Sequence, residues 1–339
     1  MDRQQQLPKL FIVVPCYNEE EVLLETIKQL SNTIQELVTS DLVAKESKIL
    51  FVDDGSRDKT WAIIAKASVA NEFVTGMKLA KNVGHQKALL AGLHKAAEVC
   101  DCAISIDADL QDDITVIRQF VEKYHDGYDI VYGVRDSRDT DSFFKKNTAL
   151  FFYRLMERLG IQLVYNHADF RLLSTRALRE LLKYEESNLF LRGIIPLLGY
   201  SSTKVYYDRK KRLAGESKYP LKKMLSFAFD GLTSFSIAPI RLITSLGFLL
   251  FFIGVITGSY ALFQKFLGAT TEGWTSLMIS IWFIGGLQLI SIGMIGEYIG
   301  KVFTEVKRRP KYAVDIDLLE RPILSRERDN IIHLEEKDG

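Results

Sequence analysis

The sequence has few cysteines and almost no net charge. Its 339 residues include 3 Cys, an odd number without the spacing of a disulfide framework or a zinc-ligand set. A reducing compartment fits this composition. The 44 Lys and Arg nearly balance the 43 Asp and Glu, so we expect no nucleic-acid partner bound through bulk positive charge. Hydrophobic residues make up 47% of the chain, which excludes a wholly disordered protein.

Charged side chains are missing from two long stretches, 242–263 and 273–296. Each is long enough to cross a hydrocarbon layer of about 30 Å as a helix. We predict two transmembrane helices, and the alternative is two buried core helices of a soluble domain. Basic residues flank both stretches, whereas the loop between them carries only Lys265 and Glu272. The positive-inside rule therefore predicts a multi-pass protein of the plasma or inner membrane, with its N-terminal domain and C-terminus in the cytoplasm.

Short apolar runs alternate with helical patterns in the first part of the chain. Strands are predicted at 9–14, 48–52, 74–79, 101–106 and 128–134, and helices at 20–37, 59–70, 86–99 and 114–124. This series predicts an α/β fold with a mostly parallel, Rossmann-like sheet. Ligands of such sheets bind beyond the carboxyl ends of the strands.

Acidic residues follow several of these strands. Asp53 follows the second predicted strand, and Asp107 and Asp109 follow the fourth, with Gln111 nearby. Oxygen ligands suit Mg²⁺ or Mn²⁺, and Mg²⁺ usually takes further ligands from water and substrate phosphates. A lone Asp-x-Asp is more simply a solvated turn or a helix cap. Acids at several ends of one sheet favour a cation and a diphosphate substrate.

The order of these motifs resembles a known family. PCYNE at 15–19, DDGS at 53–56 and DADLQ at 107–111 resemble the nucleotide-sugar-binding half of family 2 glycosyltransferases with the GT-A fold. HADFR at 167–171 and RLAGESKY at 212–219, followed by two spans, resemble its polyisoprenyl-phosphate glycosyltransferase branch. That branch includes dolichol-phosphate mannose synthases and the GtrB-type glucosyltransferases.

The resemblance implies a role for each matching residue. It implies nucleotide-sugar contacts for Pro15, Tyr17, Glu19, Asp53 and Asp107, and metal contacts for Asp107, Asp109 and Gln111. It implies acceptor-phosphate contacts for Arg135, Arg138, Arg212 and Lys218, and catalytic roles for Asp109 and Asp169. Simpler interpretations stay open. Tyr17 could pack, Glu19 could stabilise the start of a helix, basic residues could bind lipid headgroups, and His85 is expected to be structural.

The implied reaction is a metal-dependent, inverting transfer of a hexose, with UDP-glucose as the expected donor. The acceptor is the phosphate of a polyisoprenyl lipid at the cytoplasmic face of the membrane. Such a phosphate is mostly dianionic at neutral pH, so a general base is unnecessary. Two alternatives are a processive polysaccharide synthase and an inactive nucleotide-binding scaffold. The Gln-x-x-Arg-Trp motif of the synthases is absent, and Phe190-Leu191-Arg192-Gly193 stands where an acceptor helix would lie.

These patterns divide the chain into four segments. We expect a catalytic domain at 1–218 with an interfacial helix at 145–159, an amphipathic juxtamembrane helix at 219–240, a transmembrane hairpin at 241–300, and a tail at 301–339. Residues 311–318 alternate like a strand that could dock on a neighbour's sheet edge. Together with Gly254 and Gly258, which are four residues apart in the first span, this predicts a homo-oligomer. The alternative is a monomer whose tail folds back.

Overall fold

The computed structural model describes residues 7–136, 167–186, 191–208, 238–267 and 273–320. These residues form two units. One is an α/β unit that contains the described residues up to 208 and again from 310 onward, and the other is a helical hairpin within 238–309. The expected interfacial helix at 145–159 and most of the expected helix at 219–240 lie outside the described residues.

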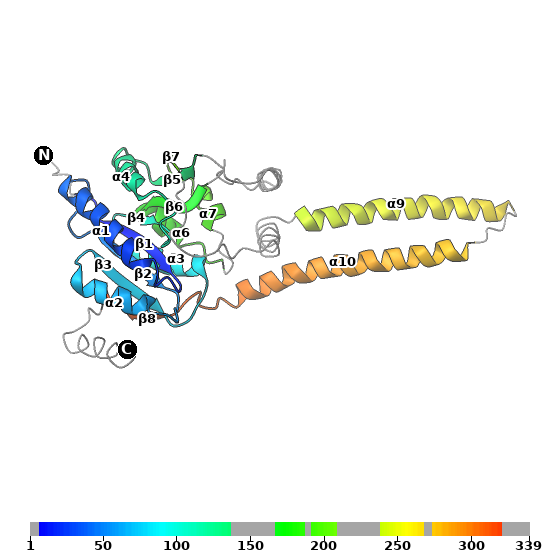
Figure 1. Cartoon of the computed structure of the whole chain (residues 1–339). Helices are drawn as coiled ribbons and strands as arrows, with labels where there is room; N and C mark the ends of the chain where they lie inside the picture. The colour runs from blue at the N-terminus through cyan, green and yellow to red at the C-terminus, as the bar shows by residue number, and fades with distance from the viewer. Residues whose placement is uncertain (1–6, 137–166, 187–190, 209–237, 268–272, 321–339) are drawn as a thin grey trace. The chain divides into compact units, whose positions relative to one another are not determined.

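The α/β unit begins with the predicted alternation of strands and helices (Figure 1). Its strands are β1 Leu10–Cys16, β2 Lys48–Asp53, β3 Val74–Leu79, β4 Cys102–Ser105, β5 Ile130–Arg135, β6 His167–Ser174, β7 Ser202–Tyr207 and β8 Val314–Asp317. Its helices are α1 Leu23–Thr39, α2 Thr60–Ala70, α3 His85–Val99, α4 Ile117–His125, α6 Thr175–Leu181 and α7 Leu191–Leu197, with a 3₁₀ turn η1 at Ile114–Val116. The first five strands and the helices between them agree with the predictions apart from their ends.

The eight strands within the described residues belong to one sheet, in the order β7-β5-β6-β4-β1-β2-β3-β8. Strands β4, β1, β2 and β3 are mutually parallel, which confirms the mostly parallel α/β fold. Strand β6 runs antiparallel between β4 and β5. The sequence patterns did not predict this reversed strand, and it is important for the site because it brings its first residues to the carboxyl edge of the parallel strands.

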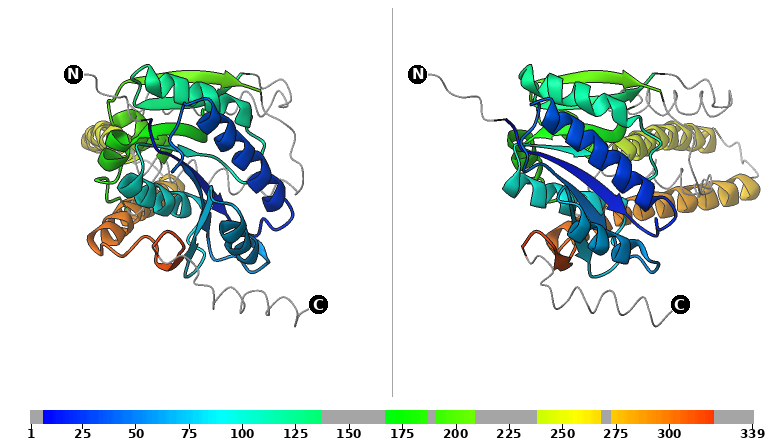
Figure 2. Two further views of the ribbon diagram at one scale, coloured as in Figure 1. Left: turned by 90° about the vertical axis from the view of Figure 1, so that its left-hand side faces the viewer. Right: turned by 60° about the vertical axis from the view of Figure 1, so that its left-hand side comes forward.

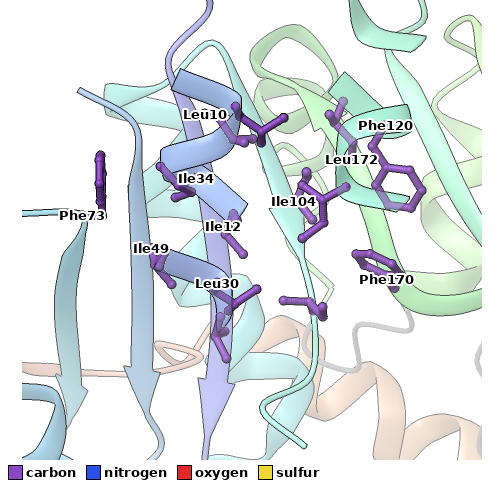
Figure 3. Packing of buried hydrophobic residues seen from close by; sticks show 14 of the residues in the cluster. Leu10, Ile12, Leu30, Ile34, Ile49, Phe73, Ile104, Phe120, Phe170 and Leu172 are labelled. Carbon is purple, nitrogen blue, oxygen red and sulfur yellow. The ribbon is translucent and has the colours of Figure 1, made fainter. Parts of the chain in front are cut away.

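Alternation along β1 explains how the sheet is covered on both faces. Leu10 and Ile12 share a buried cluster with Leu30 and Ile34 of α1 (Figure 3). Val13 points the other way, and a Cβ on Gly92 of α3 would lie 2.4 Å from its Cγ1 atom. Helices therefore lie on both sides of the sheet (Figure 2). Each fully buried aliphatic side chain contributes roughly 1.5–3 kcal/mol to folding, so this core holds the strand ends in place.

The predicted tail strand exists as β8, but its partner differs from the expected one. It pairs antiparallel with β3 of its own chain, with Ile316 opposite Lys78. The prediction that this strand docks on the sheet edge of a neighbouring copy is therefore wrong. The pairing covers the edge of the sheet at β3. Lys95 of α3, nearly buried, lies 3.1 Å from Asp317 and also contacts Glu320. Burial lowers the pKa of Lys95, but these carboxylates outweigh it and raise the pKa above its usual value.

Deleting residues 310–339 is expected to lower the Tm of the detergent-extracted protein by several degrees without changing the number of copies in the particle. The deletion uncovers β3 and leaves Lys95 without Asp317 and Glu320. Differential scanning fluorimetry measures the first quantity and native mass spectrometry the second. An unchanged Tm would contradict the stabilising role of β8. Loss of an oligomer on truncation would show that the tail contributes to an interface between copies.

The second unit is a hairpin of α9 Ala238–Phe266 and α10 Trp274–Val306. Among the described helices, the segment Phe283–Val306 is long and apolar enough to cross a membrane, with a mean hydropathy of 1.3. Its large apolar side chains, such as Phe283 and Ile299, are exposed within the chain. The predicted span in α10 therefore meets this criterion by length and composition. The predicted span in α9 stays a prediction.

Candidate active site

Several of the predicted site residues lie at the carboxyl edge of the parallel strands. Strands β1, β2 and β4 end at this edge. Because β6 is antiparallel to β4, with Ser105 opposite Arg171, its start lies there too. Continuing that register by two residues brings Asp169 across from Asp107. The topology thus brings together two carboxylates that are 62 positions apart in the numbering.

His85 lies between these two carboxylates. Its Nε2 atom is 3.5 Å from an oxygen of Asp107 and 3.8 Å from an oxygen of Asp169. It is the first residue of α3 and follows Gly84, whose φ of +94° favours glycine. The sequence pattern suggested a structural role for His85, whereas the structure places it beside two predicted site residues.

The turn that carries Asp107 and Asp109 is held by its own backbone and by α1. The hydroxyl of Thr26 donates to the carbonyl of Ala108 at 2.7 Å. The backbone amide of Gln111 donates to Asp109 Oδ1 at 3.2 Å. Burial raises the pKa of Asp107 to about 6, with a further contribution from the Asp169 carboxylate against the opposing effect of His85. The chain thus crowds negative charge at this turn, which a bound cation would relieve.

The donor set fits a cation that takes part of its shell from other molecules. Within the described ranges, no three His, Cys, Asp or Glu side chains are placed to hold a metal ion. Asp107 and Asp109 supply oxygen ligands of the kind that Mg²⁺ accepts, and Mg²⁺ commonly completes its coordination with water and phosphate oxygens. Gln111 is buried, and its role as a third ligand stays a prediction.

Asp53 is the most buried of the predicted nucleotide-contacting acids. It has no exposed surface, and burial raises its pKa despite hydrogen bonds from Ser56. The Ser56 amide donates to Oδ1 at 3.2 Å, while Oδ2 has no hydrogen-bond partner within the described part of the chain. A buried carboxylate oxygen without a donor is costly. A ligand N–H or O–H at this edge would satisfy it.

The neighbouring Asp54 has a different task. Its carboxylate accepts hydrogen bonds from the amides of Val83 at 2.7 Å and Gly84 at 2.9 Å. It therefore fixes the loop that leads into His85. Gly55 packs against the same loop, since a Cβ at its position would lie 2.7 Å from the amide nitrogen of Asn82.

The loop after β1 is tied to the loop after β2. The backbone amide of Asn18 donates to the Ser56 hydroxyl at 3.0 Å, and the backbone amide of Glu19 donates to Thr60 Oγ1 at 2.9 Å. Tyr17 is 42% exposed, so its ring is accessible to a ligand rather than fully packed. Pro15 is buried in β1. Their predicted contacts with a nucleotide stay predictions.

Asp169 binds two arginines. Arg171, on the same strand, forms an ion pair with Oδ1. Arg192, on α7, donates from Nε to Oδ1 at 3.1 Å and from Nη2 to Oδ2 at 2.9 Å. Burial alone would raise the pKa of Asp169, but the two guanidinium charges outweigh it and hold the pKa well below its usual range. Sequence reasoning assigned no role to either arginine. Arg171 shared a motif with Asp169, whereas no local signal connected Arg192 to it.

Of the predicted acceptor contacts, Arg135 is the one placed by the described residues. It is the last residue of β5 and donates to Asp112 at 3.2 Å, and the hydroxyl of Tyr207 donates to the same Asp112 oxygen. Arg138, Arg212 and Lys218 lie outside the described ranges. Their predicted contacts with an acceptor phosphate therefore stay predictions.

Comparison with known families identifies this arrangement. Residues 11–182 match the model of glycosyl transferase family 2. The chain belongs to glycosyl transferase family 2. Residues 238–302 of this glycosyltransferase match a second model, the GtrB C-terminal hairpin, and they correspond to α9 and most of α10. The resemblance inferred from the strand-end motifs and the following hairpin is thereby confirmed.

Bacterial glycosyltransferases are similar to this family 2 glycosyltransferase over most of its length. An uncharacterized glycosyltransferase, YkoT of Bacillus subtilis, is 64% identical over 98% of this chain and 99% of its own. A prophage-derived bactoprenol glucosyl transferase of Shigella flexneri is 38% identical over 90% of this chain and 97% of its own. A solved mannosyltransferase from Pyrobaculum calidifontis, with GDP-mannose and Mn²⁺, covers 90% of this chain and 89% of its own, at 14% identity and a TM-score of 0.44.

Proposed function

We propose that this glycosyltransferase transfers glucose from UDP-glucose to the phosphate of a polyisoprenyl lipid, with inversion at the anomeric carbon and with Mg²⁺ or Mn²⁺. The observation that carries the proposal is the carboxyl edge itself, which gathers Asp53, Asp107 and Asp169 and where Asp169 is paired with Arg171 and Arg192. The bactoprenol glucosyl transferase that is 38% identical supports the choice of sugar and lipid.

The donor would lie along the ends of β1, β2 and β4. Asp53 offers its buried Oδ2 to a donor group of the nucleoside, and Tyr17 offers an exposed ring beside it. Asp107 and Asp109 would hold the cation, which would stabilise the negative charge that develops on the departing UDP. The chain contributes orientation, because hydrogen bonds from Thr26 and Gln111 fix the turn that carries both acids.

The acceptor supplies its own nucleophile. A lipid phosphate oxygen attacks the anomeric carbon, the new C–O bond forms, and the bond to the β-phosphate oxygen of UDP breaks, so that UDP leaves with the electron pair. The phosphate is mostly dianionic at neutral pH, and no proton has to be removed. The low pKa of Asp169 fits this chemistry, since a carboxylate held ionised by two arginines is a poor proton acceptor.

The hairpin would bring this reaction to a membrane. We propose that α9 and α10 both span it, that the catalytic unit lies on the cytoplasmic face, and that copies associate through the small residues of the spans. The apolar segment Phe283–Val306, the match to the GtrB C-terminal hairpin and the basic flanks of both spans support this orientation.

The test is sugar transfer into lipid by the full chain in detergent or vesicles. Labelled UDP-glucose and GDP-mannose are each supplied with a polyprenyl phosphate, and organic-extractable label is counted. We expect label from UDP-glucose, release of UDP, and loss of transfer in chelator. Incorporation of label from GDP-mannose alone would show that the transferred sugar is mannose and not glucose. An insoluble polymer would favour a processive synthase, and no transfer from any donor would favour an inactive scaffold.

A further inference from the structure

The ion-pair cluster around Asp169 holds two arginines that differ in their exposure to solvent. One carboxylate meets two guanidinium groups, Arg171 and Arg192. Arg171 is 1% exposed and already neutralises the carboxylate from within the protein. The side chain of Arg192 is 42% exposed. Of the two arginines paired with Asp169, Arg192 is therefore the one that is accessible to solvent.

The geometry holds the Arg192 guanidinium in one orientation. Its Nε and Nη2 atoms both donate to Asp169, at 3.1 and 2.9 Å, so two hydrogen bonds fix the plane of the group. Asp169 itself is 8% exposed and is anchored by the Ser105 hydroxyl, which donates to its backbone carbonyl.

The cluster lies next to the predicted diphosphate site. His85 is within 4 Å of both Asp169 and Asp107. An accessible, oriented guanidinium beside the predicted cation-binding turn is suited to a phosphate oxygen. Both substrates of the proposed reaction carry one, the diphosphate of the donor and the phosphate of the acceptor.

We propose that Arg192 binds a phosphate group of one of the two substrates and that Asp169 is the positioning residue for its guanidinium. The inference rests on the proposed function. It assigns Asp169 a role other than that of a base, and it adds to the acceptor and donor contacts a residue from α7, outside every strand-end motif. Arg171 stays a buried counter-charge for Asp169.

The experiment compares Arg192→Gln and Arg192→Lys with a matched control, Arg176→Gln. Arg176 is also an exposed arginine paired with a buried aspartate, Asp129, but it lies beyond the opposite end of β6. For each full-length variant, the KM values for nucleotide sugar and lipid phosphate are measured with kcat and Tm. We expect Arg192→Gln to raise one KM by about ten-fold or more, as loss of a charge-assisted hydrogen bond does, with the control near the wild type.

Direct binding identifies which phosphate is held. If Arg192 binds the donor diphosphate, Arg192→Gln weakens binding of UDP in isothermal titration and leaves binding of uridine unchanged. If it binds the acceptor, UDP binding is unchanged and the KM for lipid phosphate rises. Arg192→Lys keeps the charge but loses the planar fork, and we expect an intermediate effect. Should Arg192→Gln not fold, Arg192→Lys supports the same comparison.

The outcomes separate this inference from the proposed function. An active wild type with Arg192 variants indistinguishable from Arg176→Gln would overturn the role of Arg192 alone. Equal changes in all binding and kinetic constants, with a lowered Tm, would show a structural effect and also overturn it. A wild type that transfers no sugar and binds no UDP would refute the proposed function, and the inference with it.

Discussion

Asp109→Ala is expected to lower kcat for sugar transfer by about 10³-fold, the scale of losing a main electrostatic contribution to the transition state. The protein should stay folded, because Asp109 lies in the turn after β4 and not in the buried core. The control is Asp113→Ala, four residues further along the same acidic segment. Asp113 caps the 3₁₀ turn through the Thr115 amide, and its loss should cost about 1 kcal/mol of stability with kcat nearly unchanged. Initial rates and Tm are measured for both variants.

Two results would count against the metal site. One is near-normal turnover by folded Asp109→Ala, and the other is wild-type turnover that persists in excess chelator. Partial recovery of Asp109→Ala at high Mn²⁺ would support it, since Asp107 remains as a ligand and added cation offsets weakened affinity by mass action.

Asp169→Ala is expected to lower the free energy of unfolding by about 3–5 kcal/mol, because it leaves a buried charge without its partner. That charge belongs to Arg171, which is 1% exposed and has another nitrogen, Nη1, without a hydrogen-bond partner in the described ranges. The matched control is Asp129→Ala, whose partner Arg176 has a 65% exposed side chain. Water can solvate Arg176 after the change, so we expect a smaller loss. Urea unfolding in detergent, followed by near-ultraviolet circular dichroism, measures both.

A second substitution separates stability from activity in this variant. Asp169→Ala with Arg171→Met removes both buried charges, and an apolar replacement of a buried ion pair is often neutral or stabilising. We expect the double variant to recover most of the lost stability and none of the lost transfer. Recovery of transfer together with stability would show that Asp169 acts only through folding.

The sequence by itself determined the local elements and the acidic edge. Apolar runs and helical stripes located the first five strands within a few residues, and the strand at 74–79 was predicted with its observed bounds. Asp53, Asp107 and Asp109 could be brought together in advance because parallel strands joined by helices place their carboxyl ends at one edge. The long uncharged stretches likewise predicted the helical hairpin, since such runs depend on composition alone.

Tertiary structure alone decided which distant groups meet at that edge. Asp169 faces Asp107 because β6 enters the sheet reversed between β4 and β5, and strand direction leaves no trace in a short apolar run. Arg192 reaches Asp169 from α7, 23 positions away, through packing that no periodicity encodes. The partner of β8 was equally undetermined. An alternating strand can pair with any open sheet edge through its backbone, and only the folded chain shows that the edge is its own β3.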